Sequence, residues 1–285
     1  MTAPAVSALL VSYNAGDELR RALQSLVEEC ADQPWEAVVV DNVSVDDSVA
    51  VAESFGPKVR VIRNHRNVGF ARGINQGLAA TTAPRVLIMN PDCRLMAGAL
   101  AGLSAALAAH DGCAIVGPRI LNPDGSVQGS ARGDPDMLTG LFGRSAALRH
   151  LLPGLPVSKR NVVEATALPP GETTVVDWLS GACMLARRDA LEQVGGFDES
   201  YFLYWEDADL CRRLRAVGYH VRYAPSATAV HRVGQSSRSA RAASTRAFHR
   251  SAYRYYATHV APSAVDPRRP IARALLAARC WLALR

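Results

Sequence analysis

A short apolar run that ends in a carboxylate constrains the fold of this chain more than any other feature. Residues 86–89 are all apolar, follow Arg85, and give way to Asn90, Pro91 and Asp92. An unbroken apolar run bounded by residues that break regular structure is typical of a strand buried on both faces of a sheet. Because an unpaired buried charge is costly, we expect Asp92 at the carboxyl edge of the sheet, where open α/β sheets bind ligands.

The same tripeptide occurs again at Asn122, Pro123 and Asp124, but here Gly125 follows and no buried apolar run leads straight into it. Asn at the first position, Pro to preset φ and a final Gly are typical of a reverse turn. We therefore interpret the second copy as structural. For the first copy, the alternative to a ligand site is a helix N-cap after a strand.

Composition indicates a globular protein, because 49% of the 285 residues are hydrophobic and 20% are charged. The formal net charge of +6 comes almost entirely from arginine, which suits polyanionic partners such as diphosphates or anionic lipid. The six cysteines show no spacing typical of a zinc site, which favours a reducing compartment. With neither a basic leader nor an apolar window of the ~20 residues that span a bilayer, we expect a cytoplasmic protein.

Strand patterns alternate with helical patterns along the first part of the chain. This alternation predicts βαβ units, hence an α/β fold with a doubly wound, mostly parallel sheet flanked by helices. Gly73 and Gly77 interrupt one of the helices, which indicates close packing. The predicted strands are 5–13, 35–40, 59–62, 85–89 and 113–121, and the predicted helices are 17–30, a segment that opens at 46–48, 70–80 and 96–109.

The second half is less regular. Residues 130–171 are rich in Gly, Pro and Arg and poorly periodic, as in a loop over a site or an insertion. Residues 174–186 predict a strand and 188–194 a short helix. A longer helix follows Glu206 and ends at Gly218, and two further strands lead to His231. From residue 236 we expect a helical extension.

Acidic residues stand where these elements begin or end. Asp41 follows a strand and could accept a hydrogen bond from a nucleobase imide, while Asp92 suits a cation that binds diphosphate. Glu206 and Asp207 open a helix beside aromatic residues, where a general base for a hydroxyl nucleophile would fit. Taken singly, Asp41 also suits a turn, the acidic pair also suits a helix N-terminus, and His231 also suits a partly buried structural histidine.

Six short motifs follow one another along the chain. They are Val-Ser-Tyr-Asn at 11–14, Val-Val-Asp-Asn at 39–42, Asn-Val-Gly-Phe at 67–70, Asn-Pro-Asp at 90–92, Gly-Phe-Asp-Glu at 196–199 and Trp-Glu-Asp at 205–207, followed by His231 and Ser236. In this order they resemble family 2 glycosyltransferases with a GT-A fold, in particular the bacterial rhamnosyltransferase-like branch. The resemblance covers about four fifths of the chain. It implies a GT-A domain over 1–235, with a nucleotide-sugar half (1–121) and an acceptor and catalytic half (122–235), followed by the extension 236–285.

The resemblance also implies roles for particular residues. Asp41 would bind the pyrimidine base. Asp92 takes the place of the last carboxylate of the family's Asp-x-Asp motif, whose first position is Asn90 here, and His231 would be a second ligand to Mg²⁺ or Mn²⁺ or a diphosphate contact. Asp207 would be the general base, with Glu206 an acceptor contact or its supporting partner. The nucleotide-sugar pocket would further include Ser12, Tyr13, Asn14, Asn42, Asn67, Gly69, Arg72 and Asn90, and the acceptor pocket Trp178, Ser180, Gly181 and Trp205.

The activity implied is metal-dependent transfer of a sugar with inversion, with dTDP-β-L-rhamnose as the expected donor. The acceptor would be a hydroxyl of a glycan or of a polyprenyl-diphosphate-linked sugar in cell-wall or polysaccharide synthesis. One alternative keeps the fold but uses a UDP-hexose such as galactose or GlcNAc. Another is a sugar-phosphate nucleotidyltransferase, although the Gly-rich basic loop of that class is missing after the first strand. A nucleic-acid binder would not need carboxylates at strand ends, so we expect no nucleic-acid partner.

The end of the chain allows two interpretations. Residues 271–284 are apolar with interspersed arginines, and Ile271, Leu275 and Leu282 would share one helix face. Such a helix suits the surface of a membrane, which would make the protein peripheral on the cytoplasmic face of the inner membrane. The alternative is a helix docked on the domain or in a homodimer interface.

Overall fold

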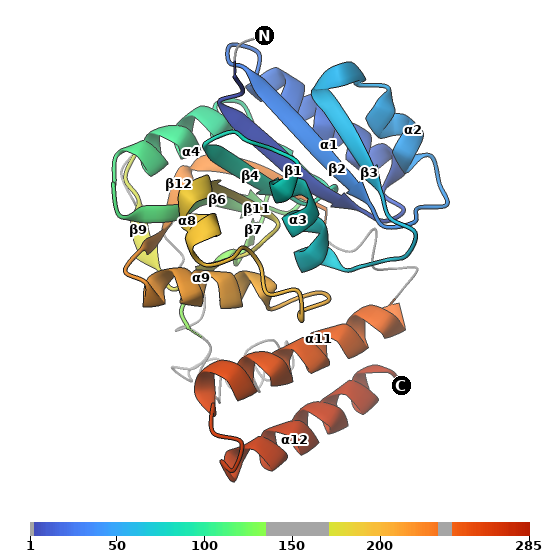
Figure 1. Cartoon of the computed structure of the whole chain (residues 1–285), viewed down its shortest axis with the longest axis vertical. Coiled ribbons are helices and arrows are strands. Elements are labelled where there is room, and N and C mark those ends of the chain that lie inside the picture. Colours follow the sequence, from blue (N-terminus) through green and yellow to red (C-terminus); the bar gives the residue numbers. More distant parts are fainter. Residues whose placement is uncertain (1–2, 135–170, 233–240) are drawn as a thin grey trace.

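The structure is a computed structural model that describes residues 3–134, 171–232 and 241–285 (Figure 1). Ser236 and most of the irregular segment 130–171 therefore lie outside the described residues. The first half of the chain alternates strands and helices as the sequence predicts. Its elements are β1 (Val6–Ser12), α1 (Gly16–Glu29), β2 (Trp35–Asp41), α2 (Ser48–Glu53), a 3-10 turn (Gly56–Lys58), β3 (Val59–Arg63), α3 (Phe70–Ala79), β4 (Arg85–Met89), β5 (Cys93–Leu95), α4 (Ala99–Ala108) and β6 (Cys113–Leu121).

The described residues of the second half add five short strands, the long strand β12, the short helix α8 and three longer helices. The element β5 is absent from the sequence-based prediction, because three residues show no measurable period. Residues 241–283 are mainly helical, as predicted. The remaining elements are β7 (Val127–Gln128), β8 (Ala131–Arg132), β9 (Thr174–Val176), β10 (Trp178–Leu179), β11 (Cys183–Arg187), α8 (Arg188–Gln193), α9 (Glu206–Ala216), β12 (His220–His231), α11 (Arg241–Tyr255), a π-helical turn (Tyr256–Val260) and α12 (Arg268–Ala283).

One sheet organises the molecule, with the strand order β3-β2-β1-β4-β11-β6-β12-β5. The strands β3, β2, β1 and β4 are parallel, and Ser12 pairs with Asp41, so these strands end at one carboxyl edge. The α/β class is confirmed. Parallel pairing returns between β6 and β12, whereas β11 runs antiparallel to both β4 and β6.

Two predicted strand boundaries differ from the structure. The segment 174–186 is divided into β9, β10 and β11, and β10 pairs with β8 in a separate two-stranded sheet. Conversely, the two strands expected between 220 and 231 are one strand, β12. Its register shifts between Ala224 and Thr228, around Pro225, because proline has no N–H to give to the ladder.

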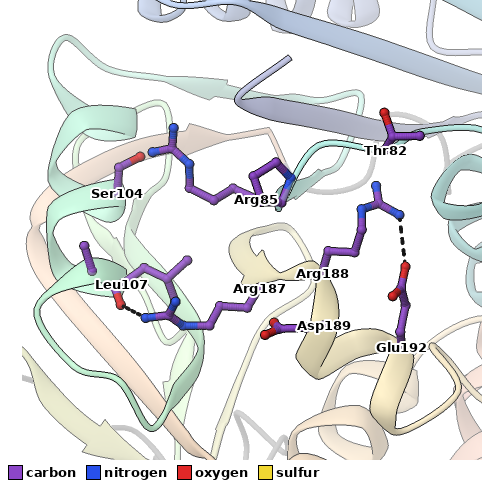
Figure 2. A pocket seen from close by; sticks show the side chains of 10 residues that line it. Thr82, Arg85, Ser104, Leu107, Arg187, Arg188, Asp189 and Glu192 are labelled. Carbon is purple, nitrogen blue, oxygen red and sulfur yellow. Dashed lines mark hydrogen bonds and ion pairs between the residues drawn. The ribbon is translucent and has the colours of Figure 1, made fainter. Parts of the chain in front are cut away.

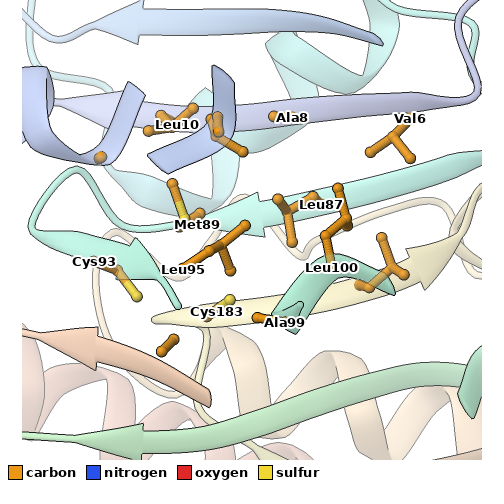
Figure 3. Packing of buried hydrophobic residues seen from close by; sticks show 14 of the residues in the cluster. Val6, Ala8, Leu10, Leu87, Met89, Cys93, Leu95, Ala99, Leu100 and Cys183 are labelled. Atoms are coloured by element: carbon orange, nitrogen blue, oxygen red, sulfur yellow. The ribbon is translucent and has the colours of Figure 1, made fainter. Parts of the chain in front are cut away.

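The core lies on both faces of the sheet. On one face, Leu10 and Met89 pack with Leu95 and with Leu100 of α4 (Figure 3). On the other face, α3 approaches β1 through its two glycines. A Cβ on Gly73 would lie 2.7 Å from Val11 Cγ2, and one on Gly77 would lie 3.0 Å from Leu9 Cδ2. The predicted close packing of this helix is confirmed.

The second Asn-Pro-Asp copy is a turn between β6 and β7, as predicted. Gly125 donates its N–H to Asn122 O at 2.9 Å and has a φ of +84°. At the other end of the chain, α11 lies between α9 and α12 (Figure 1). The helix α12 packs along α11. None of the helices in the described parts of the chain is long and apolar enough to cross a bilayer.

Candidate active site

Asp41 lies at the carboxyl end of β2 and is 4% exposed. Its Oδ2 accepts a hydrogen bond from Ser44 N at 3.0 Å. Its Oδ1 is buried and finds no hydrogen-bond partner among the described residues, and neither does the neighbouring Ser12 Oγ. A buried acceptor without a donor is costly, so this oxygen suits a ligand that brings an N–H group, as a pyrimidine imide does.

Asn42 and Asn14 shape this pocket through the loops that they hold. Asn42 Nδ2 donates to Gly69 O at 3.2 Å, and its Oδ1 accepts from Asn64 Nδ2 at 2.9 Å. Asn14, with a φ of +52°, accepts from Val45 N at 2.8 Å. The two amides therefore fix the loops after β1 and β3 against the loop after β2, beside Asp41.

The loop that contains Asn67 and Gly69 meets the segment before α9. Asn67 Oδ1 accepts from Gly69 N at 2.9 Å, and Gly69 has a φ of +87°. A Cβ on Gly69 would overlap Phe202 O, so only glycine fits there. Arg72 is exposed and pairs with Glu199 at 3.6 Å, while Tyr13 is half-buried.

Asp92 and His231 lie together although they come from opposite halves of the sequence. His231 Nε2 is 3.1 Å from Asp92 Oδ1, and both side chains are largely buried. Asn90 Nδ2 lies 3.3 Å from the same imidazole nitrogen. The structure thus brings three of the predicted site residues into one cluster beyond the end of β4.

Gln128, which sequence analysis did not single out, sets the tautomer of His231. Its Nε2 donates to His231 O at 2.7 Å and to Asn122 Oδ1 at 2.8 Å, so its Oε1 is the atom that faces His231 Nδ1 at 3.1 Å. An amide oxygen only accepts, and therefore Nδ1 carries a hydrogen and Nε2 is the nitrogen that faces Asp92. The Asn-Pro-Asp turn thereby supports the site through Asn122.

Two acceptors 3.1 Å apart need a proton or a cation between them. A carboxylate beside an imidazole nitrogen fits a divalent metal ion such as Mn²⁺. Among residues 3–134, 171–232 and 241–285 no group of three or more His, Cys, Asp or Glu residues is placed to hold a metal. A metal here would therefore take its remaining ligands from a bound diphosphate or from water.

Asp207 lies in the first turn of α9, and the two residues before the helix have strained backbones. Tyr204 and Trp205 have φ values of +67° and +69°, which non-glycine residues adopt at a cost. Asp207 Oδ2 accepts from Gly181 N at 3.0 Å, and its Oδ1 accepts from Ala208 N at 2.8 Å. The strained turn and these two donors fix the direction of the carboxylate.

Glu206 differs from its neighbour in burial. It is 5% exposed, and its Oε2 has no hydrogen-bond partner among the described residues. Burial, reinforced by the negative charges of Asp207 and Asp209, raises the pKa of the Glu206 carboxyl well above its ordinary value. The pair thus divides into a buried carboxyl whose surroundings favour the protonated form and a carboxylate fixed by backbone donors, a division typical of acid–base sites.

Direct contacts connect these clusters at one edge of the sheet. Asn42 bonds to Gly69 O, and Phe70 N donates to Phe202 O at 2.8 Å, just before α9. Asp207 bonds to Gly181 N, and Asn90 N donates to Ala182 O at 2.9 Å. Asp41, at the end of β2, Asp92, after β4, and Asp207, at the start of α9, therefore belong to segments that direct contacts connect.

The residues predicted for the acceptor pocket are held mainly by protein contacts. Trp178 Nε1 donates to Gly133 O at 2.9 Å, and Arg132 lies 5.3 Å from its ring centroid. Ser180 N donates to Ser130 O at 2.8 Å. The ring of Trp205 packs 5.2 Å from the ring of Tyr255 in α11, so this tryptophan also joins the helical extension to the site.

Sequence analysis missed a second link between the extension and α9. Asp209 is 1% exposed, and its carboxylate contacts Arg213 Nε at 2.7 Å and His259 Nε2 at 2.6 Å. The Asp209–Arg213 spacing of four residues on a helix was a readable signal. Nothing local in the sequence indicated His259, which comes from the π-helical turn after α11.

A cavity of about 560 Å³ lies away from this site, where β4 begins and β11 ends (Figure 2). Three arginines line it, but backbone carbonyls already bind them. Arg85 Nε donates to Ala5 O at 3.2 Å, Arg187 Nη2 to Leu107 O at 2.7 Å and Arg188 Nε to Ala83 O at 2.6 Å. We therefore assign these arginines to the ends of neighbouring elements and not to a ligand.

Comparison with known proteins decides the family. Residues 7–195 match the family described as "Glycosyl transferase family 2", and residues 169–282 match "Glycosyl transferase family group 2". The chain belongs to glycosyl transferase family 2. It is a glycosyltransferase, as its motifs predicted, and the nucleotidyltransferase alternative is excluded.

Two relatives of this family 2 glycosyltransferase carry rhamnosyltransferase names. It is 34% identical to an N-acetylglucosaminyl-diphospho-decaprenol L-rhamnosyltransferase of Mycobacterium tuberculosis over 96% of this chain and 91% of that protein. It is 42% identical to the rhamnosyltransferase WbbL of Escherichia coli over 84 residues, which are 30% of this chain and 32% of that one.

Among solved structures, a Pyrobaculum calidifontis mannosyltransferase in complex with GDP-Man and Mn²⁺ matches with a TM-score of 0.59 at 18% identity, over 98% of this chain and 74% of that one. At this identity the likeness concerns the fold alone. The family 2 chain has the GT-A fold that its motifs predicted.

Proposed function

We propose that this glycosyltransferase transfers L-rhamnose from dTDP-β-L-rhamnose to a hydroxyl of N-acetylglucosamine carried on a polyprenyl diphosphate. One observation carries the proposal: the 34% identity to an N-acetylglucosaminyl-diphospho-decaprenol L-rhamnosyltransferase extends over nearly the full length of both chains. Insertions that would replace one acceptor site by another have little room in an alignment of that extent.

In this proposal Asp41 recognises the nucleotide. Its unpartnered Oδ1 would accept the imide N–H of thymine, while Ser44 N keeps Oδ2 in place. The loops held by Asn14, Asn42 and Asn67 would surround the nucleoside, and Gly69 would allow close approach of the backbone. Uracil has the same imide group, so the choice between dTDP and UDP must depend on contacts to other parts of the donor.

Asp92 and His231 would hold a divalent cation, which supplies positive charge to the diphosphate as it leaves. Gln128 keeps His231 in the tautomer that this role needs. Asn90 would face the sugar or the diphosphate beside them. The mannosyltransferase of Pyrobaculum calidifontis, which was solved in complex with GDP-Man and Mn²⁺, is in line with this arrangement.

Asp207 would remove the proton from the acceptor hydroxyl as its oxygen attacks the anomeric carbon on the face opposite to the diphosphate. A single displacement inverts the anomeric centre, so a β-linked donor gives an α-L-rhamnoside. Glu206, in its protonated form, would donate a hydrogen bond to the acceptor or to Asp207, because its buried Oε2 has no partner among the described residues. Trp178, Ser180 and Gly181 would border the acceptor.

A polyprenyl-diphosphate-linked acceptor would place the reaction at the surface of a membrane, on the cytoplasmic side where sugar nucleotides are available. Within the chain, residues 1–235 would form the catalytic domain and 236–285 an extension attached to α9. The contacts of Trp205 with Tyr255 and of Asp209 with His259 support the attachment of the extension to α9.

A panel of dTDP- and UDP-sugars tests the proposal. Each donor is incubated with Mg²⁺ and a short-chain N-acetylglucosaminyl-diphospho-lipid, and released nucleoside diphosphate and lipid product are measured. The expected result is dTDP release with a rhamnosylated product from dTDP-β-L-rhamnose alone. Transfer from a UDP-hexose at a higher kcat/KM would replace the proposed donor, and release of nucleotide without a lipid product would reject the proposed acceptor.

A further inference from the structure

The last helix, α12, has two apolar sides. Leu276 and Ala272 are 5% and 2% exposed and pack with residues of α11 and of the π-helical turn. A second side carries Ile271, Leu275 and Leu282, which are 58%, 44% and 63% exposed. Docking on the protein, one of the two interpretations of the sequence, is therefore confirmed for the first side and leaves the second side uncovered.

Charge is concentrated in the same part of the chain. Residues 241–285 contain nine arginines and a single acidic residue, Asp266, which gives a formal charge of +8. Residues 1–240 together carry −2. The basic character of the protein thus belongs to the helical extension, and a polyanionic surface would attract this part and not the α/β body.

Three arginines of the extension point to solvent without an ion-pair partner among the described residues. Arg246, Arg250 and Arg273 are exposed and form no ion pair with any residue of the described segments. Asp266, the one acid, is already bound by Arg268 Nη2 at 2.6 Å. Trp281 is 53% exposed with Arg285 3.5 Å from its ring centroid, and such tryptophans are enriched where protein meets the membrane–water interface.

We propose that the exposed side of α12 docks on an anionic membrane surface, with Ile271, Leu275 and Leu282 inserted among the lipids and the arginines at the headgroups. An apolar stripe flanked by cations is the pattern of a helix that lies in the interface. A nucleic acid would not need the apolar stripe. A second copy of the chain would bring another charge of +8 against this one, which disfavours a dimer through this face.

The position of α12 suits this role. In Figure 1 the helices α9, α11 and α12 follow one another outward from the sheet, so α12 is the outer layer on the side of the molecule where α9 carries the catalytic pair. The inference rests on the proposed function only for the lipid-linked acceptor. Membrane binding itself can be measured without any transfer.

Flotation with vesicles tests the inference on the full chain. Vesicles of phosphatidylglycerol with phosphatidylcholine are compared with phosphatidylcholine alone, for the natural protein and for the triple variant Ile271→Gln, Leu275→Gln, Leu282→Gln. The matched control replaces two exposed valines of the α/β body, Val127→Gln and Val175→Gln, which are 47% and 52% exposed. Because all five side chains are exposed, neither variant should impair folding.

The natural protein and the valine control should float with the anionic vesicles, at least about tenfold more than with the neutral ones, and about 0.5 M salt should weaken this binding. The triple variant should lose at least about tenfold in bound fraction. No flotation of the natural protein, or equal flotation of the triple variant, would overturn the proposal. So would a dimer of the natural protein in sedimentation velocity that the triple variant converts to a monomer.

Transfer to a water-soluble acceptor is measured on the same samples. The triple variant should keep kcat/KM within about twofold of the natural protein on this acceptor, since its substitutions lie far from the reacting groups. A protein that floats but transfers no sugar would contradict the proposed function and leave the docking surface intact. A protein that transfers sugar but does not float would contradict the docking surface and leave the proposed function intact.

Discussion

The two ends of the parallel strands of the central sheet, called its edges here, differ in the polar groups that they expose to a possible ligand. The edge where β4 begins contains a cavity of about 560 Å³, yet its arginines are bound by carbonyls such as Leu107 O and Ala83 O. The carboxyl edge has two buried carboxyl oxygens without a partner among the described residues, Asp41 Oδ1 and Glu206 Oε2, and the close contact between Asp92 and His231. A ligand lowers the free energy where polar groups lack partners. Among the described residues that line the cavity at the first edge, Ser104 Oγ is the one buried side-chain oxygen without a partner, so the second edge is the better candidate for chemistry.

The largest difference between the edges should come from the general base. Asp207→Asn keeps the acceptor for Gly181 N but cannot take a proton, so kcat should fall by roughly 10²- to 10⁴-fold while the donor Kd stays within about twofold. Single-turnover transfer and calorimetry measure the two quantities. The control at the other edge is Asp189→Asn, an exposed acid beside the cavity, which should leave kcat unchanged. Similar losses in both variants would abolish the distinction between the edges.

The two candidate metal ligands, Asp92 and His231, give the next largest effect, and the sequence itself offers a matched control. Asp92→Asn should reduce transfer by about 10²-fold, because the diphosphate loses its bound cation. Asp124→Asn changes the same residue in the second Asn-Pro-Asp copy, a surface turn, and should retain full activity. Chelation with EDTA should abolish transfer by the natural enzyme, and Mg²⁺ or Mn²⁺ should restore it. Full activity in excess EDTA would remove Asp92 and His231 from this role.

The nucleobase contact should act on binding and not on turnover. In Asp41→Asn the amide oxygen would accept from Ser44 N, which turns the NH₂ group toward the imide N–H of the base. The donor Kd should rise about 10- to 100-fold with kcat little changed. The exposed Asp17, whose side chain is 75% exposed, provides the control Asp17→Asn. A lower kcat at unchanged Kd would move Asp41 from recognition to chemistry.

Glu206 gives the smallest effect, which concerns stability. Its folded-state pKa is raised above the ordinary value of 4.5, so the folded protein holds this proton more tightly than the unfolded chain. The natural protein therefore loses stability as the pH rises from that value through the raised one, at up to ~1.4 kcal/mol per pH unit. Glu206→Gln stays neutral and should be equal to the natural protein near pH 4 and more stable above. Urea unfolding across pH measures this difference, and parallel curves would show that Glu206 is ionised when buried.

Sequence patterns predicted the half of the fold in which local signals decide the structure. The apolar runs of β1, β2 and β4 and the polar residues that end them gave both the strands and the edge at which Asp41 and Asp92 lie. An apolar run does not show its direction, so the antiparallel β11 between β4 and β6 could not be foreseen. Two strands were expected between residues 220 and 231, but β12 continues through a shift in register around Pro225.

The candidate site residues also differ in whether local sequence signals indicate them. The order of the motifs pointed to Asp41, Asp92, His231 and Asp207, because each stands beside a recognisable strand or helix end. Gln128 and His259 were missed because their roles depend on partners far away in the sequence, His231 for one and Asp209 for the other. The different environments of the Glu206 and Asp207 carboxyl groups could not be predicted either, because the burial of each side chain depends on the tertiary structure.

The central claim is that Asp41, Asp92 and Asp207 surround one bound sugar nucleotide. Calorimetric titration of dTDP-β-L-rhamnose into the natural protein and the three asparagine variants, with and without Mg²⁺, tests it most directly. The account predicts heat with the natural protein that depends on Mg²⁺, weakened binding in Asp41→Asn and Asp92→Asn, and nearly full binding in Asp207→Asn. If no sugar nucleotide gives heat in the presence of Mg²⁺, or if all three variants bind like the natural protein, the account is contradicted.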